Sequence, residues 1–159
     1  MNIHIVCIGS IKEEYLKAAI KEYEKRLSRY VKIDIIELKD EKTVEGATQA
    51  ASDKIKRMEG ERIRKALPDG AYTIALDIKG RMLSSEKLAE HMQKWETASH
   101  SNLYFIIGGS IGLSDEIIDA SDYRLSFSPM TFPHQLMRVI LLEQIYRSYK
   151  IRMGEPYHK

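Results

Sequence analysis

Apolar residues in this chain gather in short β-branched runs that alternate with longer stretches of helical spacing. The runs predict five strands, at residues 3–8, 31–38, 71–78, 103–107 and 123–127. Between them, periodicity and capping residues predict a helix carrying the stripe Leu16, Ile20, Tyr23 and Leu27, then helices at 47–67, 84–97, from Ser114, and from Pro133 to about Arg152. Strands that alternate with helices indicate an α/β fold with a mostly parallel sheet flanked by helices.

The predicted strands differ in character. Residues 103–107 are the most apolar, which favours a central position buried on both faces. Lys32 and Asp34 alternate with apolar residues in 31–38, which favours an edge strand with one wet face.

Several residues signal where helices begin. Ser10 and Glu13 have the spacing of a capping box, and Ser84 or Ser85 and Ser114 are candidate caps. Pro133 suits the first turn of the last helix, whereas Gly60 is expected to weaken the 47–67 helix.

Composition adds limits rather than a function. The 159 residues fit one domain, and no repeat or linker divides residues 1–159. The net charge of +2 neither requires nor excludes a nucleic-acid partner. No apolar run approaches the roughly 20 residues of a membrane span, and the N-terminus enters a strand without a leader. The single cysteine, Cys7, favours a reducing cytoplasm.

Glycines follow the predicted central strand. Gly108-Gly109-Ser110-Ile111-Gly112 stands where open α/β sheets usually bind ligands, and glycine lets a ligand approach the backbone. The pattern is neither a dinucleotide fingerprint nor a phosphate-binding loop. A ligand-contacting loop and a tight structural turn are therefore both open interpretations.

A loop at residues 126–134 has an unusual composition of hydroxyls, two prolines and apolar side chains. It is either a stiff connector in which Thr131 caps the last helix, or a pocket wall. In the second interpretation its backbone binds an adenine edge while Met130 and Phe132 cover the face of the base. Leu76, near the end of the third strand, either adds an apolar wall or only packs in the core.

The last helix and the tail suggest contacts with other molecules. Apolar residues cover more than one stripe of the helix, which fits either burial within the chain or two-fold self-association. Basic and aromatic residues mix at the C-terminus, as in surfaces that bind phosphates and stack on bases. The alternative is a frayed, solvated tail.

Patterns typical of other kinds of site are missing from the sequence. The five histidines lack metal-ligand spacing, so no metal site is expected. Cys7 lies within an apolar strand and is interpreted as inert core. Asp77 follows a strand as a ribose-binding acid would, but its companion glycine motif is absent.

Three segments together resemble a known family: Leu103-Tyr-Phe-Ile-Ile-Gly-Gly-Ser-Ile-Gly-Leu113, Leu125-Ser-Phe-Ser-Pro-Met-Thr-Phe-Pro-His-Gln135 and Pro156-Tyr-His-Lys159. They resemble the SPOUT-class (α/β-knot) RNA methyltransferases, and specifically the ribosomal RNA large subunit methyltransferase H family. The likeness covers essentially the whole chain. It implies a C-terminal trefoil knot, which sequence physics alone would not propose, and a homodimer.

The resemblance also implies S-adenosylmethionine as methyl donor. The implied target is N3 of a pseudouridine in 23S (large-subunit) ribosomal RNA of the assembled ribosome. The expected donor-binding residues are Leu76, Gly108, Phe127, Ser128, Pro129, Met130, Thr131 and Phe132. His158 is the expected proton acceptor, with Tyr157 positioning the base and Arg152 and Lys159 binding phosphate.

Other functions also fit the residues. One is the same chemistry on another RNA such as transfer RNA, and another is a non-catalytic ribosome-binding assembly factor with a vestigial pocket. A dinucleotide-dependent oxidoreductase is disfavoured because the early glycine fingerprint is missing.

Overall fold

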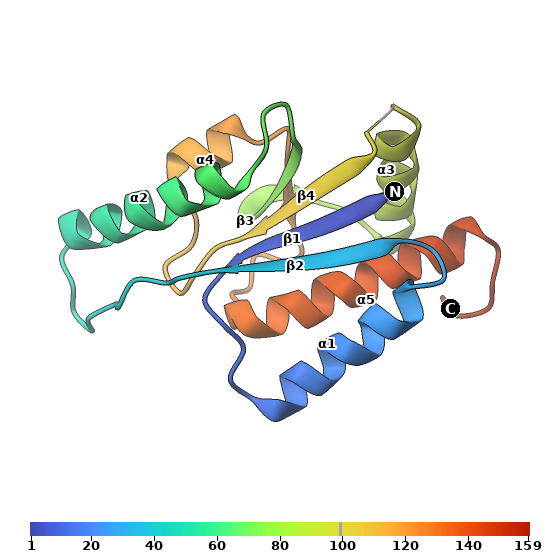
Figure 1. Ribbon diagram of the computed structural model, residues 1–159, viewed down its shortest axis with the longest axis horizontal. Helices are drawn as coiled ribbons and strands as arrows, with labels where there is room; N and C mark the ends of the chain where they lie inside the picture. Colours follow the sequence, from blue (N-terminus) through green and yellow to red (C-terminus); the bar gives the residue numbers. More distant parts are fainter. Residues whose placement is uncertain (99) are drawn as a thin grey trace.

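The computed structural model describes residues 1–98 and 100–159 and has one five-stranded sheet between two layers of helices (Figure 1). The strands pair in parallel, in the order β2-β1-β4-β3-β5. They are β1 (Asn2–Ile8), β2 (Lys32–Leu38), β3 (Tyr72–Met82), β4 (Asn102–Ile107) and β5 (Tyr123–Ser126). The central place of 103–107 and the edge place of 31–38 are thereby confirmed.

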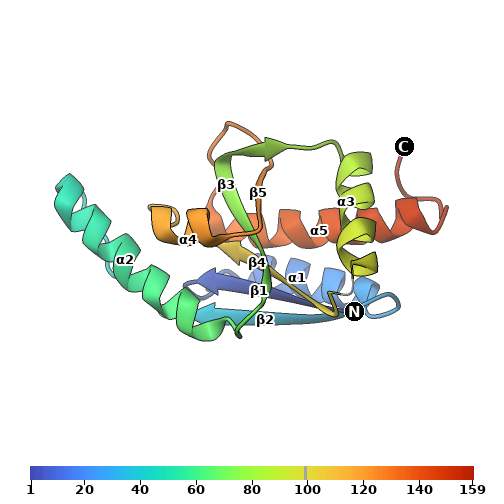
Figure 2. The ribbon, with the colours of Figure 1, turned by 90° about the horizontal axis from the view of Figure 1, so that it is seen from above.

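Helices connect these strands: α1 (Glu14–Leu27), α2 (Gln49–Ala66), α3 (Ser85–Thr97), α4 (Asp115–Ala120) and α5 (His134–Arg152). Helices α1, α3 and α5 cover one face of the sheet, and α2 and α4 cover the other (Figure 2). The predicted α/β fold with a mostly parallel sheet is therefore confirmed.

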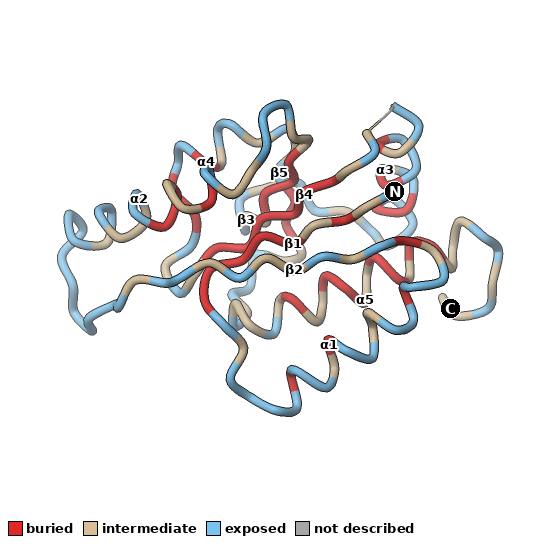
Figure 3. Tube along the Cα trace, in the orientation of Figure 1, coloured by how far each residue is buried: buried red, intermediate tan, exposed pale blue. Residues whose placement is uncertain are grey.

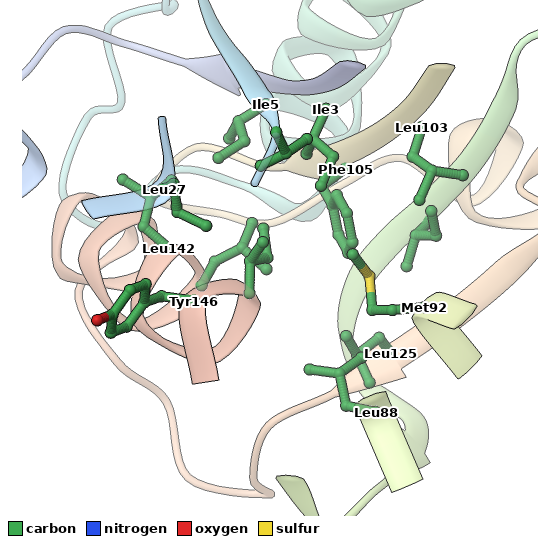
Figure 4. Close-up of a cluster of buried hydrophobic side chains, with 14 of the residues drawn as sticks. Ile3, Ile5, Leu27, Leu88, Met92, Leu103, Phe105, Leu125, Leu142 and Tyr146 are labelled. Carbon is green, nitrogen blue, oxygen red and sulfur yellow. The ribbon is translucent and has the colours of Figure 1, made fainter. Parts of the chain in front are cut away.

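Each face of the sheet has its own core because successive strand residues point to opposite sides. Ile3, Ile5 and Phe105 pack toward α1, α3 and α5 (Figure 4). Val6 and Ile106 pack toward α2 and α4. The central strands are buried along most of their length, whereas the outer turns of the helices face solvent (Figure 3).

Two predicted caps are wrong. Helix α1 begins at Glu14 after Glu13, with no side-chain cap, so the capping box that starts at Ser10 does not form. Helix α5 begins after Pro133, also without a side-chain cap, so Thr131 does not cap it. The hydroxyls of Ser84 and Ser114 do cap α3 and α4, as predicted.

The third strand is longer than predicted. It continues to Met82, and its pairing with β5 shifts register so that Leu76 and Arg81 both lie opposite Leu125. The residues between them form an excursion that passes close to β5. A Cβ on Gly80 would lie 2.8 Å from the carbonyl carbon of Arg124, so glycine is needed for this approach.

Candidate functional site

A cavity of about 970 Å³ opens at the carboxyl ends of β3, β4 and β5. We call it the strand-end cavity. Its walls come from the end of β3, the glycine loop after β4, helix α4, and the segment from β5 into α5. It is lined by seven of the eight predicted donor-binding residues: Leu76, Gly108, Phe127, Ser128, Met130, Thr131 and Phe132.

Pro129 is the eighth predicted residue, and its position differs. It is exposed and does not belong to the described lining of the strand-end cavity. The neighbouring Met130 lines the cavity while 71% exposed, so it lies at the rim rather than at the bottom.

The glycine loop is a tight turn that also forms a wall of the cavity. The Gly112 N–H donates to the Gly109 carbonyl oxygen at 3.1 Å, and Gly112 has a φ of +86° that favours glycine. A Cβ on Gly108 would lie 2.7 Å from the Gly112 carbonyl carbon. The compact turn therefore presents bare backbone to the cavity, and ligand contact by this loop stays a prediction.

Hydrogen bonds within the chain hold the segment after β5. The Ser126 hydroxyl contacts the carbonyl oxygens of Ile78 at 3.0 Å and Ser128 at 3.2 Å. The Met130 N–H donates to the Ser128 hydroxyl at 3.0 Å. This segment is thus tied to the β3 excursion, and two walls of the cavity are built as one unit.

Several cavity residues were not predicted from the sequence. Added charges come from Lys56, Lys79, Asp115, Asp119 and Arg124. His134 and Met137 line the cavity from the start of α5, and burial lowers the pKa of His134, as does the nearby Arg138 guanidinium. The charged residues come from separate parts of the chain and share no motif, so their convergence depends on the tertiary fold, whereas His134 belongs to the 126–134 loop that the sequence offered as a pocket wall.

Helix α2 supports the glycine loop from behind. Glu59 is 4% exposed, and its Oε2 accepts the Glu41 N–H at 3.0 Å. Its Oε1 has no hydrogen-bond partner among the described residues and would lie 3.2 Å from a Cβ on Gly109. Burial raises the pKa of Glu59, and the nearby Asp40 adds to this effect.

Gly60 has a packing role that the sequence did not reveal. Helix α2 continues through it without interruption, and a Cβ there would lie 2.8 Å from the Ser114 Oγ. The missing side chain allows α2 to dock on the start of α4. A residue expected to weaken the helix thus brings α2 close to the glycine loop.

Arg138 ties the start of α5 to the ends of β1 and β2. Its side chain is 1% exposed and donates to Glu37 Oε2 at 2.6 Å and to the Gly9 carbonyl oxygen at 2.7 Å. These partners compensate a buried charge that would otherwise be strongly unfavourable.

The C-terminal tail packs against the chain instead of fraying. The Tyr157 hydroxyl donates to Glu143 at 3.1 Å, and its ring meets Tyr146 edge-on at 4.9 Å. Burial, followed by the hydrogen bond to Glu143, raises the pKa of Tyr157 to about 12. The ring nitrogens of His158 lie 2.7 Å from Glu86 and 3.1 Å from Arg147.

The two predicted phosphate-binding residues differ in their surroundings. Arg152 pairs with Glu96 and lies over the Tyr149 ring, 5.0 Å from its centre. Lys159 is exposed at the end of the chain. Lys159 is therefore presented to solvent as the prediction requires, whereas Arg152 already has an ion-pair partner.

The cavity is lined from the start of α5, by His134 and Met137, whereas the tail follows the other end of this helix, where Figure 2 marks the C-terminus. A helix of 19 residues is about 28 Å long, with His134 at the cavity and Arg152 leading into the tail. The fold therefore brings the predicted donor-binding residues together but does not bring His158 of the same chain to them.

Two other kinds of feature are not found in the described residues. Across 1–98 and 100–159, no three His, Cys, Asp or Glu side chains gather as a metal site would require. No helix within these same ranges has both the length and the apolar character needed to cross a membrane. Cys7 is fully buried, and burial raises the pKa of its thiol to about 11, in agreement with an inert core residue.

Comparison with solved structures shows a shared fold. A probable methylase family protein from Haemophilus influenzae Rd KW20 matches over 99% of this chain and 70% of its own, with a TM-score of 0.61 at 14% identity. A putative methylase family protein from Neisseria gonorrhoeae matches over 99% and 85%, with a TM-score of 0.53 at 12% identity.

Sequence comparison is more specific. The chain is 57% identical over 159 residues to the ribosomal RNA large subunit methyltransferase H of Alkaliphilus oremlandii, and equally to that of Clostridium novyi. Both alignments cover 100% of each chain. The family model described as "Predicted SPOUT methyltransferase" matches residues 1–158. The chain therefore belongs to the SPOUT methyltransferase family.

Proposed function

We propose that this protein transfers a methyl group from S-adenosylmethionine to N3 of a pseudouridine in large-subunit ribosomal RNA, acting on the assembled ribosome in the cytoplasm. The observation that carries the proposal is the strand-end cavity, because seven of the eight predicted donor-binding residues line it. Its volume of about 970 Å³ lies within the range of small-molecule pockets. The names of the two 57% identical relatives support the ribosomal RNA substrate.

The chain's own residues would hold the donor in two ways. Gly108 lines the cavity with backbone, and its missing side chain lets the glycine loop fold back closely on Gly112 and Leu113. Leu76, Phe127 and Phe132 offer apolar walls, and the hydrogen-bonded segment around Ser128 offers backbone groups for a base edge. When bound, the donor supplies an electrophilic methyl group on a sulfonium centre.

A homodimer with a C-terminal knot belongs to the same proposal. Large apolar side chains are exposed on segments that form or adjoin the cavity, namely Ile78, Met82, Met130 and Leu136. A two-fold contact over them would bury this surface and allow one chain's tail to approach the other chain's cavity. The knot in this proposal rests on the likeness to the SPOUT methyltransferase family.

The proposed reaction needs alignment and a proton acceptor. As the bond from N3 to the methyl carbon forms, the carbon–sulfur bond breaks and the N3 proton leaves. The partner chain's His158 takes this proton, while Tyr157 positions the base and Lys159 contacts phosphate. Alignment of reacting atoms is worth about 7–11 kcal/mol in well-oriented systems, so most of the acceleration comes from positioning.

Methyl-label transfer tests the activity. Assembled ribosomes, free ribosomal RNA and transfer RNA are incubated with labelled donor, and the modified nucleotide is mapped. We expect label only on the large-subunit RNA of assembled ribosomes. His158→Ala should abolish transfer while calorimetry shows unchanged donor affinity. Labelled transfer RNA would replace the substrate, and absence of donor binding would favour a non-catalytic assembly factor.

Mixing two impaired variants tests the shared site, at a donor concentration too low to fill the Gly108→Ala cavity. Gly108→Ala damages the cavity and His158→Ala damages the tail. If each site combines one chain's cavity with its partner's tail, mixed dimers contain one intact site and regain activity. Mixed dimers that stay inactive would contradict a site shared between chains.

A further inference from the structure

Both ring nitrogens of His158 are occupied within the chain. Nε2 lies 2.7 Å from Oε1 of Glu86, in the first turn of α3. Nδ1 lies 3.1 Å from Nη1 of Arg147, near the end of α5. The ring therefore bridges α3 and α5, and its partners come from helices that the sequence places far apart.

The chemistry of these partners identifies the tautomer of His158. An arginine side chain only donates hydrogen bonds, so Nδ1 is the nitrogen that carries the lone pair. An ionised carboxylate only accepts them, so Nε2 carries the proton. Hydrogen bonds from its own backbone N–H and from His158 lower the pKa of Glu86, which favours the ionised form. The ring is then neutral, with Nδ1 as its single acceptor.

Arg147 is itself held in place by other groups. Its Nε donates to Oε1 of Glu143 at 3.0 Å, and its guanidinium lies 4.7 Å from the centre of the Tyr157 ring. Neither contact involves His158, so Arg147 keeps both contacts when its hydrogen bond to Nδ1 of His158 is broken. The charged and titratable groups around the ring are thus Glu86 from α3, Arg147 and Glu143 from α5, and Tyr157 from the tail.

We propose that Glu86 is a positioning residue for His158: it holds the proton on Nε2, so that Nδ1 is the nitrogen that accepts the substrate proton. Arg147 covers Nδ1 in the resting state and is displaced by the substrate. This inference rests on the proposed function, because it assigns a role to His158 in the same methyl transfer.

Proton transfer explains why Arg147 has to move. Once Nδ1 binds the proton from N3, the ring carries a proton on each nitrogen, and the Nδ1–H would face the N–H of the guanidinium. The same step strengthens the hydrogen bond between His158 and Glu86, because a charged ring is a stronger donor to the carboxylate than a neutral ring. Glu86 therefore stabilises the protonated ring, and Arg147 stabilises the resting one.

Ring-nitrogen NMR on the full-length, substrate-free protein tests the tautomer directly. With labelled histidine, and His158→Ala used to assign the signals, we expect the proton of neutral His158 on Nε2. In Glu86→Ala this preference should be reduced or lost. A neutral ring protonated on Nδ1 in the unsubstituted protein would overturn the inference, whatever the activity of the enzyme.

Steady-state kinetics test the role in the reaction. For Glu86→Ala we expect kcat to fall about two- to fivefold, as for loss of a partly exposed charged pair, with donor affinity and KM for ribosomes unchanged. Glu86→Gln should recover part of kcat because its amide oxygen still accepts from Nε2. The matched control is Glu90→Ala, which removes an exposed carboxylate one turn along α3 and should leave kcat unchanged.

The two proposals fail in different ways. If His158→Ala is inactive but Glu86→Ala keeps full kcat, the inference about Glu86 is wrong and the proposed function stands. If His158→Ala itself keeps full kcat, His158 is not the proton acceptor and both assignments are overturned.

Discussion

Alanine at position 108 should weaken donor binding far more than it weakens the fold. A Cβ there would lie 2.7 Å from the carbonyl carbon of Gly112 and 3.0 Å from both the Gly112 oxygen and the Leu113 nitrogen. All three neighbours are backbone atoms, so no side chain is able to rotate away. Because ordinary van der Waals contact begins at 3.4 Å, the glycine loop has to open by about 0.7 Å.

The size of the effect follows from this overlap. Overpacking of a tightly packed site typically costs about 1–3 kcal/mol. The loop relieves this overlap by opening into the cavity, and donor binding has to reverse that movement. Donor affinity therefore falls by roughly 5- to 150-fold. Calorimetric titration with S-adenosylmethionine measures the loss, and urea unfolding measures the change in stability.

Gly70→Ala is the matched control. Gly70 has a φ of +75°, and a Cβ there would meet nothing within 4 Å. The substitution therefore introduces backbone strain of about 1–2 kcal/mol in the turn before β3, at the opposite end of this strand from the cavity. We expect similar loss of stability with unchanged donor affinity. Unchanged donor affinity in Gly108→Ala would refute the assignment of this loop to the donor site.

Two further predictions concern buried charges. Arg138→Met should destabilise the protein by about 1–3 kcal/mol because it leaves the Ile8 and Gly9 carbonyls without their side-chain donor, whereas Arg64→Met, which breaks an exposed pair, should cost less than about 1 kcal/mol; equal losses in urea unfolding would contradict this. For Glu59, whose pKa is raised above its unfolded value, the stabilising effect is complete below the unfolded pKa and is lost as pH rises through the folded pKa. The stability of the unsubstituted protein relative to Glu59→Gln should therefore decline from about pH 4 upward, and parallel pH curves for the two proteins would show that Glu59 does not titrate in this way.

Local patterns in the sequence determined the strands, their order of burial and the α/β class. An apolar run such as 103–107 indicates its own burial, because its composition suits a strand covered on both faces. The glycines at 108–112 and the segment at 126–134 were also visible, since their unusual residues follow strand ends. The structure brings these two segments to one cavity.

Only the tertiary structure decided which residues support that cavity and what holds the tail. Glu59 and Gly60 look unremarkable in a charged helix, and their contacts with the glycine loop and α4 arise from how α2 docks. The bridge from His158 to Glu86 and Arg147 likewise joins residues with no common pattern. Periodicity and propensity describe neighbours along the chain, whereas these contacts join residues distant in sequence and depend on the packing of whole elements.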